Sequence, residues 1–117
     1  MQTLQIRNST AEFLIFTKQN KEKTIEVIVD EETVWLSQKL MAELFGTTRN
    51  NITMHLTSIF NNELNKDSVC KDFLHTASDG KNYKTKYYNL DAIIAVGFKI
   101  NSERAIEFRL WAISILK

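Results

Sequence analysis

The chain has 117 residues, of which 44% are hydrophobic, and its formal net charge at pH 7 is +1. This length and apolar content indicate one domain, residues 1–117, that buries a core without disulfides. The near-neutral charge means that the chain lacks the strongly basic composition that is usual for nucleic-acid-binding domains. The single cysteine, Cys70, forms no internal disulfide, and no apolar run is long enough to span a membrane. We therefore expect a cytoplasmic domain, with residues 1–11 disordered.

Two β-prone segments are predicted near the amino terminus. Residues 12–17, EFLIFT, are rich in β-branched and aromatic side chains, and residues 24–30, TIEVIVD, alternate between two faces. Runs of this kind on either side of a polar turn are typical of antiparallel strands. The sequence therefore predicts a β-hairpin over residues 12–30.

Residues 37–60 have the pattern of two short helices joined by a glycine turn. Apolar residues recur at intervals of three and four, which places them on one side of each helix; they are Leu40, Met41, Leu44, Phe45, Ile52, Leu56 and Phe60. Ser37 is a suitable N-cap for the first helix, and Thr47 or Thr48 for the second. Gly46 can take the positive φ that ends a helix and redirects the chain.

The second of these helices is predicted to turn a face of mostly polar and short side chains away from the core. This face consists of Arg49, Asn50, Thr53, Met54 and Thr57. Two helices with a tight turn and such a face are typical of a helix-turn-helix, whose second helix enters the major groove of DNA. An ordinary helical hairpin in a globular core would show the same apolar spacing, so the motif alone leaves both interpretations open.

Residues 71–89 are predicted to form a second hairpin. Two β-prone runs, KDFLHT and YKTKYYN, flank ASDGKN, in which Asp79-Gly80 is a strong turn signal. A hairpin after a recognition helix corresponds to the wing of a winged helix-turn-helix, and Lys81, Lys84 and Lys86 would hold the DNA backbone. The alternative is a charged edge that discourages sheet aggregation.

Two helices are predicted over residues 90–117, with Asn89 and Ser102 as their N-caps. The last helix carries two neighbouring apolar stripes, one of Ala105, Phe108, Ala112 and Ile115 and one of Ile106, Leu110 and Ile113. A helix that is apolar over so wide an arc needs partners on more than one side. We therefore expect either a fragment of a longer protein or a homodimer formed through this helix.

The chain resembles the amino-terminal domain of the RhuM-type virulence proteins. The similarity extends from about Glu12 onward and includes the segments TVWLSQKLMAELFG and YYNLDAIIAVGFKINSERAIEFRLWA. Residues 105–111 are also similar, more weakly, to the closing helix of Bro-type DNA-binding domains of phage antirepressors. The resemblance implies a bacterial protein, longer than this chain, with a role in DNA binding and no defined mechanism.

The sequence gives little support for catalytic chemistry. A thiolate at Cys70 with His75 as its base is conceivable, but no third group orients the pair, and a structural cysteine is the simpler interpretation. Two histidines and one cysteine at distant positions form no metal-ligand set of recognised spacing. We therefore predict no enzyme activity, no cofactor and no metal.

Together these patterns predict an α+β, winged helix-turn-helix-like domain with an amino-terminal hairpin, a wing hairpin and two carboxy-terminal helices. The expected function is binding of double-stranded DNA, in transcription regulation or a mobile-element function. The alternative is a protein-interaction or dimerisation module that binds no nucleic acid, which the near-neutral charge favours.

Overall fold

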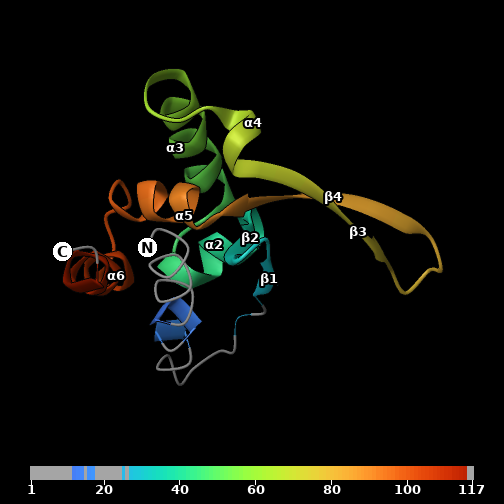
Figure 1. Cartoon of the computed structure of the whole chain (residues 1–117), viewed down its shortest axis with the longest axis horizontal. Helices are drawn as coiled ribbons and strands as arrows, with labels where there is room; N and C mark the ends of the chain where they lie inside the picture. Colours follow the sequence, from blue (N-terminus) through green and yellow to red (C-terminus); the bar gives the residue numbers. More distant parts are fainter. Residues whose placement is uncertain (1–11, 15, 18–24, 26, 116–117) are drawn as a thin grey trace.

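The computed structural model of the protein describes residues 12–14, 16–17, 25 and 27–115; residues 1–11, predicted to be disordered, lie outside this range. The architecture is α+β, as the sequence predicts, with helices packed around an antiparallel sheet of strand order β1-β2-β4-β3 (Figure 1). The strands are β1 (Ile28–Asp30), β2 (Thr33–Ser37), β3 (Cys70–Thr76) and β4 (Asn82–Asn89). The helices that follow β2 in the chain are α2 (Gln38–Phe45), α3 (Arg49–Asn62), α4 (Lys66–Val69), α5 (Leu90–Gly97) and α6 (Glu103–Ile115).

The segment that the sequence predicts as the first strand of a hairpin over residues 12–30 is helical instead. Residues 12–14 and 16–17 have helical backbone, and the predicted turn at residues 18–23 lies outside the described residues. Phe13 is fully buried and Thr17 is buried four positions later, which is a helical period. The Phe13 ring packs edge-on against the rings of Phe108 and Trp111. The prediction was wrong because a short apolar run fits a buried helical turn as well as a strand.

The hairpin that the structure does form near this end joins β1 to β2 through Glu31 and Glu32. Both residues have positive φ, 54° and 63°, as the two-residue turn between such strands requires. Lys71 reaches this turn from β3, where its Nζ pairs with Asp30 Oδ2 at 2.6 Å and with the Glu31 carboxylate. The same Nζ lies 4.6 Å from the centroid of the Trp35 ring. Non-local contacts therefore hold a turn that glutamate itself disfavours.

The two helices predicted over residues 37–60 are α2 and α3. The Ser37 hydroxyl accepts a hydrogen bond from the Leu40 amide at 3.2 Å, and the Thr48 hydroxyl accepts one from the Asn51 amide at 3.1 Å. Gly46 ends α2 in the left-handed conformation, with φ 63°. The caps and the glycine turn are thus as predicted. The side chains that these helices bury are Met41, Ala42, Leu44, Phe45, Ile52, Leu56 and Ile59.

Strands β3 and β4 form a long hairpin, here called the arm (residues 70–89), which projects from the body of the molecule (Figure 1). Its base is fixed because β4 also pairs with β2, and because Tyr88 is buried and stacks on Phe60. The turn at its far end contains Gly80 at φ 82°. This arrangement agrees with the hairpin predicted over residues 71–89.

Helices α5 and α6 complete the hydrophobic core, and α6 buries one of its two predicted stripes. Ala105, Phe108 and Ala112 are fully buried; the side chain of Ile115 lies outside the described residues. The other stripe is exposed to solvent, with Ile106, Leu110 and Ile113 between 46% and 66% exposed. No helix among the described residues is long and apolar enough to cross a membrane.

Candidate nucleic-acid interface

The outward face of α3 is open to solvent. Each of the five residues predicted to lie on it is exposed, and none is covered by the sheet; they are Arg49, Asn50, Thr53, Met54 and Thr57. The buried stripe of the same helix lies on the opposite side and begins with Ile52. The helix is therefore amphipathic in the sense that the sequence predicts.

The two threonines of this face already use their hydroxyl groups within the protein. Thr53 Oγ1 lies 2.6 Å from Gln38 Oε1, to which it donates, and the Gln38 amide nitrogen donates to the Tyr88 hydroxyl at 3.0 Å. Thr57 Oγ1 donates to the Thr53 carbonyl at 3.0 Å. The chain Thr53–Gln38–Tyr88 joins α3 through α2 to the base of the arm, and so sets how the helix lies relative to β4. Gln38 could not be predicted to hold this position, since its partners Thr53 and Tyr88 are distant in sequence.

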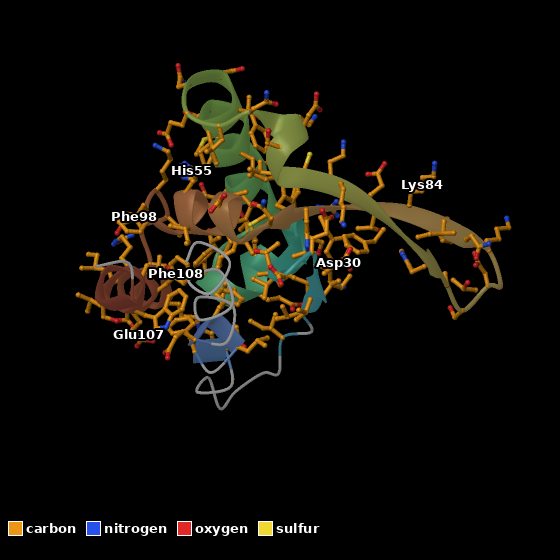
Figure 2. All side chains as sticks on the ribbon, in the orientation of Figure 1. Asp30, His55, Lys84, Phe98, Glu107 and Phe108 are labelled. Carbon is orange, nitrogen blue, oxygen red and sulfur yellow. The ribbon has the colours of Figure 1, made fainter. Side chains whose placement is uncertain are left out.

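The predicted lysines lie along one strand of the arm and at its turn. Lys84 and Lys86 belong to β4, and Lys81 immediately precedes that strand. All three side chains are exposed. Lys81 also contributes to the turn, because its backbone amide donates to Asp79 Oδ1 at 2.9 Å. Figure 2 shows Lys84 on the projecting part of the arm, well away from the helical core.

A groove of about 540 Å³ lies between the arm and the start of α2 and α3. Its lining includes Arg49 from α3 together with Lys84 and Lys86 from the arm, so the fold brings together three residues that were predicted in two separate motifs. The remaining predicted residues do not line it; these are Asn50, Thr53, Met54, Thr57 and Lys81.

The groove is basic although the chain is nearly neutral. Four permanent cations line it, against one carboxylate: Lys39, Arg49, Lys84 and Lys86 face Glu43. A second hollow, of about 680 Å³, shares Lys39, Glu43 and Arg49 with the first and adds Arg104. The positive charge therefore continues around the start of α3. Lys39 was not predicted because only the second helix of the pair was expected to face DNA, and Arg104 was not predicted because it is distant in sequence from both motifs.

The catalytic pair considered from the sequence is not assembled. Cys70 and His75 lie five residues apart on β3, and an odd separation on a strand places two side chains on opposite faces. Burial raises the pKa of the Cys70 thiol, which disfavours the nucleophilic thiolate. Among the described residues, no three side chains of the types His, Cys, Asp and Glu are grouped so that they could hold a metal ion.

Comparison with known proteins agrees with the resemblance found in the sequence. The sequence model of the virulence protein RhuM family matches residues 68–117, which include the arm and helices α5 and α6. No curated protein and no solved structure matches the chain. This match covers 50 of the 117 residues, and over that part the chain is similar to the virulence protein RhuM family.

Proposed function

We propose that this domain binds double-stranded DNA as a winged helix-turn-helix, with α2 and α3 as the helix pair and the arm as the wing. The observation that carries the proposal is the basic groove between α3 and the arm. A groove lined by Lys39, Arg49, Lys84 and Lys86 suits a sugar-phosphate strand, whose charges lie close together along the backbone.

The two walls of the groove have different roles in this proposal. Lysines of the arm contact phosphates, which fixes the register of the protein without sequence choice. On the other wall, α3 enters the major groove and presents Asn50 and Met54 to base edges. An asparagine amide can pair with adenine, and a methionine can contact the thymine methyl group. Thr53 and Thr57 support the helix, because their hydroxyl hydrogens are used within the protein.

Removing one cation from each wall tests the proposal. We expect the double variant Arg49→Ala/Lys84→Ala to bind duplex DNA more weakly than the unchanged protein, as measured by fluorescence anisotropy over a range of salt concentrations. The plot of log K against log[salt] has a negative slope, and the magnitude of this slope should decrease by about 2, which is about 1 for each lost phosphate contact.

The matched control is Lys66→Ala/Lys99→Ala, which removes the same charge from residues outside the groove. Lys66 is exposed on α4, and Lys99 pairs with Glu63 at 2.7 Å on the surface. If both double variants lost the same affinity, the loss would be explained by the change in net charge and not by contacts in the groove. Unchanged affinity in Arg49→Ala/Lys84→Ala would contradict the proposed interface.

The exposed stripe of α6 supports a second proposal, that the domain dimerises with another copy of itself through this helix. Ile106, Leu110 and Ile113 form an apolar surface on a helix whose other stripe is already buried. Pairing two copies would present two recognition helices, as a two-fold operator requires. If the groove binds no DNA, a protein-interaction module remains as the alternative function, based on the same stripe.

The oligomeric state tests this second proposal. We expect a dimer in sedimentation equilibrium, and we expect Leu110→Glu to convert it to a monomer because the charge would be buried at the interface. A sedimentation profile that is monomeric for the unchanged protein would refute dimerisation through α6.

A further inference from the structure

We infer that the arm lies in the minor groove of the bound DNA and that Leu74 contacts the base edges there. This inference rests on the proposed function and adds the groove that the wing occupies and the residue that enters it. Leu74 is 64% exposed on the projecting part of β3, and the hydrophobic core of the protein does not use it.

The position of the basic groove determines which DNA groove the arm meets. In a duplex, each sugar-phosphate strand separates the major groove from the minor groove. If one strand lies in the groove between α3 and the arm, these two elements are on opposite sides of that strand. With α3 in the major groove, the arm therefore lies in the minor groove.

The two faces of the arm differ in what already covers them. On one face, aromatic rings cover one another: Phe73 lies 5.1 Å from Tyr87 and 5.9 Å from Trp35 between ring centroids, and His75 lies 6.1 Å from Tyr83. These ring contacts cover part of this face, and Thr85 on the same face is half-buried.

The opposite face combines one apolar side chain with two cations. Leu74 pairs directly with Lys84, so the two side chains project together, and Lys86 lies two residues further along the same face. Asp72 faces Lys86 and offsets part of its charge. An apolar side chain flanked by lysines has the chemistry of a minor-groove contact, in which the cations meet phosphates and the apolar group meets the sugars and base edges.

Side-chain hydrogen bonds within the arm brace its far end. Thr76 Oγ1 donates to Asn82 Oδ1 at 2.7 Å across the two strands, and the Tyr83 hydroxyl donates to Asp79 Oδ2 at 2.7 Å. Because these bonds order the turn in advance, the arm loses little conformational entropy on binding. A rigid arm of this kind suits entry into a narrow groove.

Duplexes of alternating dG·dC and dI·dC test the inference. Inosine lacks the exocyclic amino group that guanine places in the minor groove, while the two pairs present the same hydrogen-bonding pattern in the major groove. We expect the protein to bind the dI·dC duplex about fivefold more tightly or better, the discrimination given by one base-edge contact. We expect Leu74→Ala to lose most of this preference.

Two controls separate this inference from the proposed function. Lys84→Ala should bind both duplexes more weakly but keep the preference, because a phosphate contact is indifferent to the base. Val29→Ala, a change at another exposed strand residue of the same sheet, 54% exposed, should change neither quantity. Equal affinity for the two duplexes, or a preference that survives Leu74→Ala, would overturn the minor-groove inference while DNA binding stands. No binding to either duplex would overturn both.

Discussion

The helical core and the arm are stabilised in different ways. In the core, Phe108 is fully buried and its ring lies within 4.9 to 6.3 Å of four other rings, those of Phe13, Phe16, Phe45 and Trp111. In the arm, backbone pairing between two strands and a few hydrogen bonds between near neighbours hold the structure, and Leu74 is mostly exposed.

The difference shows where a substitution changes folding and where it changes binding alone. A core ring contacts residues from several elements, so its loss is felt throughout the domain. A side chain on the projecting part of the arm, such as Leu74, faces solvent, and its removal leaves the backbone pairing intact. The arm can therefore be altered to test DNA contacts without confounding loss of the fold.

The sharpest comparison is between Phe108→Ala and Leu74→Ala. We expect Phe108→Ala to lower the free energy of unfolding by about 3–5 kcal/mol, because it removes a buried ring and leaves a cavity. Leu74→Ala should change it by no more than about 0.5 kcal/mol, as exposed substitutions usually do. Urea denaturation measures both values. Similar losses in the two variants would mean that the arm is part of the core.

Gly97→Ala should have the next largest effect. A Cβ atom at Gly97 would lie 2.4 Å from Cδ2 of Phe108 and 3.1 Å from Cε1 of Phe45, and both rings are fully buried. Overpacking costs about 1–3 kcal/mol, and a contact of 2.4 Å with a buried ring places Gly97→Ala at the upper end of that range. The better helix propensity of alanine offsets up to about 1 kcal/mol of this cost. The same denaturation curves measure the net loss. An unchanged or raised midpoint would show that the aromatic cluster can rearrange.

Much of the local structure follows from the sequence. Ser37, Thr48 and Asn89 each accept the backbone hydrogen bond expected of an N-cap. Gly46 has the positive φ expected at the end of α2. These features are predictable because the residues that determine them are adjacent in the chain, and the physical constraint acts over three or four positions.

The features that the sequence did not reveal depend on residues far apart. Arg104 donates to the Glu43 carbonyl at 2.9 Å, and Arg109 donates to the Ile100 carbonyl at 2.7 Å, so both arginines bind carbonyl groups at or just beyond the ends of other helices. The basic groove depends in the same way on the distance between α3 and the arm. The spacing of residues along the sequence does not predict contacts between elements that are far apart in the chain. Residues 12–17 were misassigned for a related reason, since Phe13 is buried against Phe108 of α6, which is distant in the sequence.

Gly46→Ala should have a smaller effect than Gly97→Ala, and one that can be assigned to the backbone. Alanine at φ 63° costs about 1–2 kcal/mol. Its Cβ would also lie 3.3 Å from Arg104 Cδ. Gly46→Asn is the matched control, because asparagine makes the same Cβ contact but tolerates the left-handed conformation better. We expect Gly46→Asn to be the more stable variant by denaturation. Equal losses would assign the cost to the Arg104 contact.

The smallest expected effect lies at the turn of the arm and depends on pH. The amide of Lys81 and the hydroxyl of Tyr83 both donate to the Asp79 carboxylate and hold its pKa below the usual value. The same bond to Asp79 raises the pKa of the Tyr83 hydroxyl. A group with a lowered pKa stabilises the folded turn above its unfolded pKa, and this contribution is lost as the pH falls through the folded value. A group with a raised pKa stabilises the turn below its unfolded pKa, and this contribution is lost as the pH rises through the folded value.

The turn should therefore be most ordered at pH values above the pKa of Asp79 and below the pKa of Tyr83. The stability of the core should not change with either titration. We expect the Lys81 amide resonance in NMR spectra to shift at the acid limit as Asp79 is protonated, and again at the alkaline limit as Tyr83 ionises. Asp79→Asn should remove the acid step, and Tyr83→Phe should remove the alkaline step and raise the pKa of Asp79, because one of its two donors is lost. A Lys81 resonance that titrates identically in Tyr83→Phe would mean that the hydroxyl does not hold the carboxylate. The end of the arm would then be ordered by backbone pairing and by the Lys81–Asp79 and Thr76–Asn82 hydrogen bonds, without a contribution from Tyr83.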